Sequence, residues 1–114
     1  MAEKTIFEKI IDREIKGDIV YEDDRVAAFR DVNPQAPTHI LVVPRKHIDR
    51  IENLTEDDEG LVGHMVYVAT QIAKKEGLDG GYRLVLNNGS DGGQSVFHIH
   101  LHLLGGRSFG WPPG

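Results

Sequence analysis

Apolar residues near the N-terminus follow the spacing of a short helix. The stripe consists of Ile6, Phe7, Ile10 and Ile11, which recur at helical intervals. Thr5 and Glu8 fit a capping box, in which each side chain accepts a hydrogen bond from a free backbone N–H of the first turn. Gly17 is expected to end this helix, because glycine readily adopts the left-handed conformation found after helix C-termini.

A second, longer helix is predicted from Thr55 to Glu76. Asp58 is the expected capping partner of Thr55, and the acidic first turn suits the positive end of the helix dipole. Gly77 follows as a terminator. The apolar stripe of this helix consists of Leu61, Met65, Val68, Ala69, Ile72 and Ala73. It is richer than one small sheet needs to cover, which favours association with a second copy.

Short apolar and β-branched runs predict five strands. They cover Ile19–Tyr21, Val26–Phe29, Thr38–Val43, Tyr82–Leu86 and Val96–Leu104. Turns rich in acidic residues, glycine or proline separate them, and these short connections favour antiparallel pairing. Because the helices do not alternate strictly with the strands, we predict an α+β fold. Its parts are a five-stranded antiparallel sheet, one short helix and one long helix, in a single domain over residues 1–114.

The composition excludes several classes of function. The 114-residue chain has no cysteine, which excludes disulfides and thiolate metal sites. Its formal net charge of -5 argues against binding to polymeric nucleic acid, which needs a basic face, but not against binding of a small nucleotide. The sequence has no run of about 18 apolar residues to span a membrane, and its N-terminus lacks the apolar segment of a signal peptide. We therefore expect a cytosolic or nuclear protein that does not enter membranes.

Three histidines stand at alternate positions of the last predicted strand. Side chains on a strand alternate between its faces, so His98, His100 and His102 are expected to share one face. The opposite face is expected to enter the core through Phe97, Ile99, Leu101 and Leu103. Three imidazoles in strict alternation are improbable as unrelated surface residues. The row therefore indicates a functional site, either catalytic or metal-binding.

A metal site is one interpretation of the row. Alternate strand residues lie about 6.7 Å apart, so His98 and His102 would be about 13 Å apart at the backbone. Zinc needs its nitrogen ligands at about 2 Å, so at most two of the three could share one ion, with His39 as a third ligand. No carboxylate stands near the row in sequence to orient the rings. We therefore predict no metal and no cofactor.

Nucleophilic catalysis is the favoured interpretation. Imidazole is a good nucleophile near neutral pH and bonds directly to phosphorus. His100 has an imidazole on each side, one to orient it and one to donate to a phosphate oxygen. The preceding Gly89–Ser95 loop has glycines that allow backbone N–H groups to turn toward an anion. Ser95 and Asn87 add polar groups beside the same loop.

These residues resemble the histidine-triad (HIT) motif, in which three histidines alternate with apolar residues and two apolar residues follow. The resemblance covers nearly the whole chain and is closest to the Hint branch, the histidine-triad nucleotide-binding proteins. The segments that carry it are Phe29–Val32, Pro34–His39, Gly89–Val96, His98–Leu104 and Trp111–Gly114.

The resemblance implies a homodimer whose two sheets join into one. It also implies hydrolysis of purine nucleoside 5′-phosphoramidates and acyl-nucleotide adducts, with AMP- or GMP-type nucleotides as the bound small molecules. His100 would attack the α-phosphorus and form a nucleotidyl-histidine, which water then hydrolyses. His102 and the backbone amides around Ser95 and Val96 would hold the phosphate oxygens. Ser95 would lie near the leaving group.

The remaining implied roles concern support and nucleotide binding. His98 and His39 would form a supporting hydrogen-bond network, and Asp31 would bind the ribose diol. The base pocket would be lined by Ile6, Phe7, Phe29 and Val32. Other nucleotide contacts would come from Asn87, Gly93, Gln94 and, in the partner's site, Trp111.

Without the resemblance, these residues have ordinary explanations. Asp31 would be a turn residue, and Phe29 and Val32 would belong to the core. Ile6 and Phe7 would pack the first helix, and Trp111 would be part of a tail packed on the body. His47 would lie on the surface, and His64 has no visible partner on the long helix. Arg30 stands where animal Hint proteins more often carry histidine, beside the expected ribose site, so it would tune base preference.

Two other functions remain open. A Fhit-like enzyme would cleave dinucleoside polyphosphates by the same covalent route, although Gly105-Gly106-Arg107 and the Trp-Pro-Pro-Gly tail favour the Hint branch. A nucleotide-binding regulatory module without catalysis is the second alternative. The complete triad and Ser95 speak against it.

Overall fold

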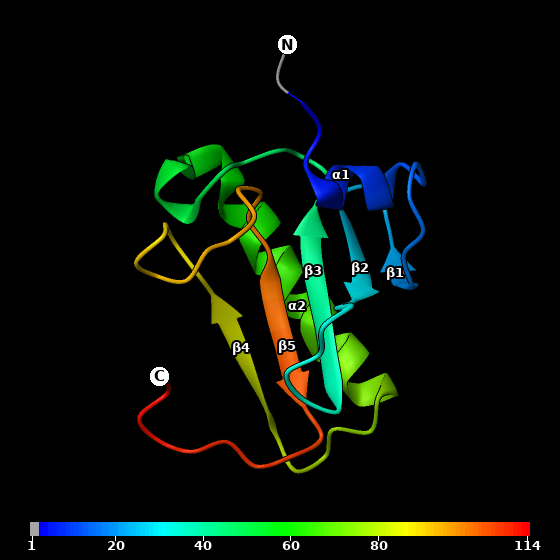
Figure 1. Cartoon of the computed structure of the whole chain (residues 1–114), viewed down its shortest axis with the longest axis vertical. Coiled ribbons are helices and arrows are strands. Elements are labelled where there is room, and N and C mark those ends of the chain that lie inside the picture. Colours follow the sequence, from blue (N-terminus) through cyan, green and yellow to red (C-terminus); the bar gives the residue numbers. More distant parts are fainter. Residues whose placement is uncertain (1–2) are drawn as a thin grey trace.

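The computed structural model describes residues 3–114; Met1 and Ala2, part of the N-terminal stretch considered above, lie outside it. Its described part contains five strands in one antiparallel sheet of order β1-β2-β3-β5-β4 (Figure 1). The strands are β1 (Ile19–Glu22), β2 (Val26–Arg30), β3 (Thr38–Pro44), β4 (Tyr82–Leu86) and β5 (Leu101–Gly105). The helices are α1 (Ile6–Ile11) and α2 (Glu59–Lys75). This confirms the predicted α+β fold.

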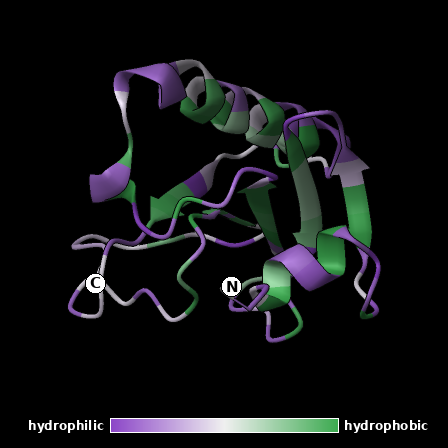
Figure 2. Cartoon of the chain, turned by 90° about the horizontal axis from the view of Figure 1, so that it is seen from above, coloured by the Kyte–Doolittle hydropathy of each residue, from purple (hydrophilic) through white to green (hydrophobic). Residues whose placement is uncertain are grey.

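The two helices lie on opposite sides of the sheet, as the view along it shows (Figure 2). On one side, α2 buries most of its predicted stripe, with Met65, Val68, Ala69, Ile72 and Ala73 packed against the sheet. On the other side, α1 covers Ala27, Phe29, Leu41 and Val43 with its own apolar residues. The expectation that the stripe exceeds what one sheet can cover is therefore wrong. The large apolar residues that α2 leaves exposed are instead Val66 and Tyr67.

The first helix is shorter than predicted. Its capping box between Thr5 and Glu8 is present, but α1 ends at Ile11 with Asp12 as C-cap. Arg13 leaves the helix in the left-handed region, at φ 60°. Gly17 is not the terminator; it packs so closely on Ile10 that an added Cβ would lie 2.5 Å from that side chain. Close packing, and not helix termination, explains the glycine.

The second helix also begins later than predicted. The capping box of Thr55 and Asp58 forms as expected, with the Thr55 backbone N–H donating to the Asp58 carboxylate at 2.9 Å. It caps a short 3-10 turn, Glu56–Asp58, from which α2 continues at Glu59. A further 3-10 turn, Ile51–Asn53, precedes it. Within residues 3–114, neither helix has the length and apolar character needed to cross a membrane.

The last strand is the largest departure from the prediction. We predicted it from Val96, but β5 begins at Leu101. β4 ends at this point, where Leu86 pairs with Leu101. β3 continues to Pro44 beside β2, but its last pair with β5 is Val42 with Leu101. Residues 96–100 therefore lie outside the ladder, and Phe97 is 41% exposed instead of entering the core. Ile99, Leu101 and Leu103 are buried on the α2 side, as predicted.

Candidate active site

A cavity of about 250 Å³ opens on the α1 side of the sheet, between α1, the end of β2 and the segment before β5. Its apolar wall includes Ile6, Phe7, Phe29, Val32 and Val96. Its polar lining residues are Asp31, Ser95, His100 and His102, together with Arg30, whose guanidinium points elsewhere, as described below. The structure thus brings together nine of the residues that the sequence predicted, from segments far apart in the chain.

His100 is held with one ring nitrogen free. Its Nδ1 lies 2.8 Å from the carbonyl oxygen of His98, so Nδ1–H donates to that oxygen and Nε2 carries the lone pair. The edge-to-face ring of Phe7 packs on it at 4.8 Å between centroids, and the ring of His102 lies at the same distance on another side. His100 is only 6% exposed, although it lines the cavity. The neutral ring therefore presents an unprotonated nitrogen from a fixed position.

His102 is held in the opposite tautomer by His39. The backbone N–H of Gln35 donates to Nδ1 of His39 at 3.1 Å, so the proton of His39 sits on Nε2. That Nε2–H donates to Nδ1 of His102 at 2.9 Å. The remaining proton of a neutral His102 is therefore on Nε2, as a hydrogen-bond donor. The cavity thus places an imidazole lone pair beside an imidazole N–H.

Burial keeps these rings neutral. It lowers the pKa of His39 and of His100 below the ordinary value. The pKa of His102 falls to about 4, through burial first and then through the nearby rings of His100 and His39. At neutral pH the three rings are therefore uncharged, which is the state that both the lone pair on His100 and the tautomer chain require.

His98 lies outside the cavity. It is fully buried, and its Nε2–H donates to the carbonyl oxygen of Pro44 at 2.7 Å. Its Nδ1 then accepts from the hydroxyl of Thr5 at 3.1 Å. His98 and His39 therefore both make hydrogen bonds that position other groups, as the expected supporting role requires, but each has its own partners and they hold different rings. Burial lowers the pKa of His98 as well.

Asn87 and Gln94, which we expected to contact the nucleotide, instead form hydrogen bonds that hold the glycine-rich loop together. Asn87 donates to the carbonyl of Gly92 at 2.7 Å. The buried Gln94 accepts from the Gly89 N–H and donates to the carbonyls of Asp49 and Val96. Neither side chain lines the cavity, and nor does Gly93, whose φ of +85° turns the loop. The loop instead delivers Ser95 and Val96 to the cavity rim.

The other predicted nucleotide residues differ in position. Asp31 is half-buried at the cavity, where Oδ1 accepts the Asn33 N–H at 2.8 Å and Oδ2 lies 3.6 Å from Nε2 of His39. Ile6 and Val32 are on its rim, with exposures of 52% and 93%. Trp111 is 85% exposed and is not part of the cavity.

Arg30 turns its side chain away from the expected ribose site. Its guanidinium forms a two-pronged pair with Glu76 at the end of α2, at 2.9 and 3.1 Å. Because residues along β2 alternate between faces, this places the guanidinium on the α2 side while Phe29 and Asp31 face the cavity. The expectation that this charge tunes base preference is therefore not supported by its position.

Two histidines outside the motif have partners that the sequence did not reveal. His64 on α2 lies with Nε2 2.6 Å from the Asp23 carboxylate, although it had no visible partner in sequence. His47 is exposed, as expected, but its Nε2 donates to the Phe97 carbonyl at 2.8 Å. The residues that fix the tautomers, Gln35, Pro44 and Thr5, were also missed. Gln35 and Pro44 act through backbone atoms, so their side chains give no indication of this role in the sequence. Thr5 acts through its hydroxyl, but the sequence identified it only as a helix cap.

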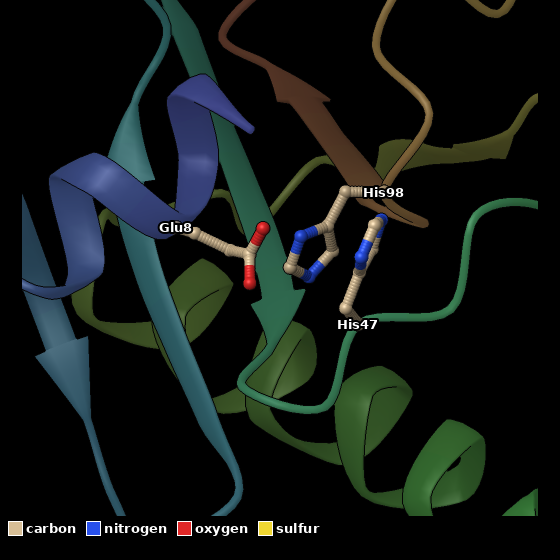
Figure 3. Close-up of side chains that lie close together, drawn as sticks. All are labelled: Glu8, His47 and His98. Atoms are coloured by element: carbon tan, nitrogen blue, oxygen red, sulfur yellow. The ribbon is translucent and has the colours of Figure 1, made fainter. Parts of the chain in front are cut away.

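Two groups of side chains approach the spacing of metal ligands. One is Glu8, His47 and His98, which come from α1, the loop after β3 and the segment before β5 (Figure 3). In it, Thr5 and Pro44 already occupy both ring nitrogens of His98. The other is Asp31, His39 and His102, in which His39 uses both nitrogens and His102 uses Nδ1. The hydrogen bonds present therefore favour ring orientation over metal binding.

A larger hollow, of about 620 Å³, lies at residues 77–83 and 106–109. It contains none of the histidines or cavity residues described above. Size alone therefore does not identify the site; the convergence of neutral imidazoles on an apolar cavity does.

Comparison with known proteins agrees with this geometry. Residues 12–109 match the HIT domain. An uncharacterised HIT-like protein of Synechococcus elongatus is 57% identical over 114 residues, covering 100% of both chains. A HIT family hydrolase from Legionella pneumophila, known from its crystal structure, is 51% identical with a TM-score of 0.94, covering 97% of this chain and 100% of that one. A histidine triad nucleotide-binding protein from Candida albicans is 30% identical with a TM-score of 0.81, covering 96% and 83%. The chain therefore belongs to the HIT domain family.

Proposed function

We propose that this protein hydrolyses purine nucleoside 5′-phosphoramidates and acyl-nucleotide adducts through a covalent nucleotidyl-histidine on His100. The observation that carries the proposal is the pair of fixed tautomers in the cavity. The Nδ1–H of His100 is held by the His98 carbonyl, which leaves Nε2 as a lone pair, and His102 presents an N–H beside it. A nucleophile next to a preorganised donor is what phosphoryl transfer needs, because charge develops on the phosphate oxygens as the bond forms.

The reaction has two steps. His100 Nε2 attacks the α-phosphorus, and the P–N bond to the amine breaks as the P–Nε2 bond forms. The departing nitrogen takes up a proton from solvent, relayed by the exposed hydroxyl of Ser95 at the cavity. Water then attacks the same phosphorus and gives up a proton to solvent as the P–Nε2 bond breaks, which restores the neutral His100. The nucleoside monophosphate and the amine are the products. Throughout, the His102 Nε2–H donates to a non-bridging phosphate oxygen.

The rest of the cavity suits the nucleoside. Clefts for small molecules are mostly apolar with a few fixed polar groups, and here the wall of Phe7, Phe29 and Val96 is suited to a planar base. The Asp31 carboxylate lines the same cavity, where it can accept hydrogen bonds from the two ribose hydroxyls. The names of the similar proteins from Legionella and Candida, a hydrolase and a nucleotide-binding protein, agree with both parts of the proposal.

The proposal includes a homodimer in which the two sheets join and Trp111 reaches the partner's cavity. Support comes from large apolar residues that stay exposed in one chain, among them Val66 and Tyr67 on α2 and Trp111 in the tail. An exposed tryptophan is costly in water, whereas at an interface it supplies a large contact area.

The test compares turnover of adenosine 5′-phosphoramidate and diadenosine triphosphate by purified protein. We expect the phosphoramidate to be the better substrate, and His100→Ala to lower kcat by roughly 10³-fold or more while nucleotide binding persists. His64→Asn, which changes a histidine on α2 far from the cavity, is the matched control and should retain activity. Dominant cleavage of the triphosphate would indicate a Fhit-like enzyme. Binding without turnover of either would indicate a regulatory module.

A further inference from the structure

His100, whose Nε2 carries the free lone pair, is not part of the sheet. His100 precedes the first residue of β5, and residues 96–100 have no strand partner on either side. One backbone–backbone bond ties this segment to the body, from the Ile99 N–H to the Ile48 carbonyl at 2.8 Å. The side chains of Gln94 and His47 donate to carbonyls at its start, those of Val96 and Phe97, and not to His100. A nucleophile must be placed within a fraction of an ångström of its productive position. Other contacts must therefore fix the segment.

The ring of His98 supplies that anchor. It is completely buried and bridges two separate elements, with Nε2–H donating to the Pro44 carbonyl at the end of β3 and Nδ1 accepting from Thr5 at the start of α1. The carbonyl of the same residue accepts the Nδ1–H of His100. Because the ring and the carbonyl belong to one residue, fixing the ring fixes the acceptor that sets the tautomer of His100.

The Thr5 hydroxyl makes two hydrogen bonds, one that caps α1 and one that holds the ring of His98. Its oxygen accepts the Glu8 N–H at 3.1 Å as the N-cap of α1, and its proton points to Nδ1 of His98. The backbone N–H of Thr5 donates separately to the Glu8 carboxylate at 2.9 Å. The helix that begins here also places Phe7, whose ring contacts both His98 and His100.

We infer that Thr5 is a positioning residue for His100. Through its hydroxyl, the N-terminus of α1 holds the His98 ring, and the His98 carbonyl in turn holds His100 as the Nδ1–H tautomer with Nε2 free. This inference deepens the proposed function and rests on it for the kinetic consequence, but not for the tautomer itself. Thr5 touches no substrate; it acts through His98.

The test separates this role from helix capping. Thr5→Val removes the hydroxyl at nearly constant shape, and Thr5→Ala is a second variant in case the valine methyl crowds the imidazole. Thr5→Ser restores the hydroxyl. Glu8→Ala is the matched control, because it removes the other capping bond and leaves the hydroxyl in place. Urea unfolding and a two-dimensional NMR spectrum establish that each variant is folded.

The first readout is the tautomer of His100, from the 15N shifts of its ring nitrogens at pH 7.5. We expect the Nδ1–H form to dominate in the wild type, Thr5→Ser and Glu8→Ala. In Thr5→Val and Thr5→Ala the Nε2–H form should rise several-fold. The second readout is turnover of adenosine 5′-phosphoramidate. We expect kcat to fall roughly three- to tenfold in the two hydroxyl-free variants, the effect of about one hydrogen bond, with little change in KM.

The results that overturn the inference are distinct from those that overturn the function. If Thr5→Val and Glu8→Ala lose stability alike and both keep the wild-type His100 tautomer, Thr5 is a cap and nothing more. If the wild type turns over no phosphoramidate, the proposed function is wrong, and the tautomer comparison still decides the role of Thr5. Loss of kcat in Thr5→Val without recovery in Thr5→Ser also contradicts the inference.

Discussion

At the scale of single residues, the chemistry of the cavity is set by which ring nitrogen carries the proton. His39, His98 and His100 each have a partner that dictates the tautomer, and two of those partners are backbone carbonyls. The alternation of histidines was enough to predict that these residues act together and that the middle one is the nucleophile candidate. The tautomers could not be predicted, because a carbonyl partner such as that of Pro44 is present at every position of every chain.

The buried neutral rings make stability depend on pH. The folded pKa of His102, about 4, lies below the value of about 6.5 in the unfolded chain, so the unfolded chain binds the proton first as pH falls. Stability is therefore complete above pH 6.5 and declines below it. Between pH 7 and 5 we expect this residue alone to remove about 1–2 kcal/mol. Urea unfolding measures this, and His102→Asn should show a visibly smaller decline than the wild type. An equal decline in the two proteins would show that His102 is not desolvated as described.

At the scale of elements, the sequence predicted the strands and helices but misplaced by several residues the end of α1 and the starts of α2 and β5. The capping boxes of Thr5 and Thr55 were visible because they depend on residues four positions apart or fewer. The early start predicted for β5 was wrong because strand length depends on pairing, and the pairs with β3 and with β4 both stop at Leu101, although β3 itself continues to Pro44. Residues 97–100 alternate between apolar and polar side chains as a strand does, but they have no strand to pair with and are therefore not part of β5.

The loop before His98 needs a glycine at one particular position. An added Cβ at Gly92 would lie 2.4 Å from the backbone carbonyl oxygen of Asn88, so the loop must move to accept it. Gly92→Ala is therefore expected to displace Ser95 and Val96 from the rim and to lower kcat/KM by roughly tenfold, as small misplacements at active sites do. Steady-state kinetics on adenosine 5′-phosphoramidate measures this. Ser90→Ala, exposed on the same loop, is the control, and equal effects of both changes would rule out the steric explanation.

His64 ties the long helix to the turn between β1 and β2, at one edge of the sheet. Its Nε2 lies 2.6 Å from Asp23 in the turn between β1 and β2, and the same carboxylate accepts from Tyr21 at 2.7 Å. Removing a hydrogen bond to a charged group costs roughly 1–3 kcal/mol. We expect His64→Ala to lower the free energy of unfolding by about that amount, whereas Lys74→Ala, exposed on the same helix, should change it little. Chemical denaturation followed by circular dichroism distinguishes them, and indistinguishable midpoints would remove this contact from the account.

At the scale of the whole molecule, one chain covers both faces of its sheet and still leaves large apolar groups uncovered. The predicted stripe of α2 turned out to be used internally, which the sequence could not reveal because it does not say which elements share a core. Among the large apolar residues that remain exposed are Val66 and Tyr67 on α2 and Trp111 in the tail. The residues that line the cavity, His100, His102 and Ser95 among them, all come from one chain.

We expect a stable dimer in solution, of twice the 12.7 kDa chain mass. Light scattering after size-exclusion chromatography at micromolar concentration measures it. Tyr67→Asp should shift the protein toward the monomer, because a charge at an apolar interface is costly to desolvate. A wild-type protein that elutes at the mass of one chain would contradict the dimer while leaving the chemistry of the cavity intact.

The most direct test of the central claim is to trap the covalent intermediate. Rapid denaturation during turnover of adenosine 5′-phosphoramidate, followed by intact-protein mass spectrometry and peptide mapping, should reveal one adenylyl group per chain, attached to Nε2 of His100. The adduct should be absent from His100→Ala and present in His64→Asn. A nucleotide attached to another residue, or turnover without any adduct under conditions in which the intermediate accumulates, would contradict His100 as the nucleophile.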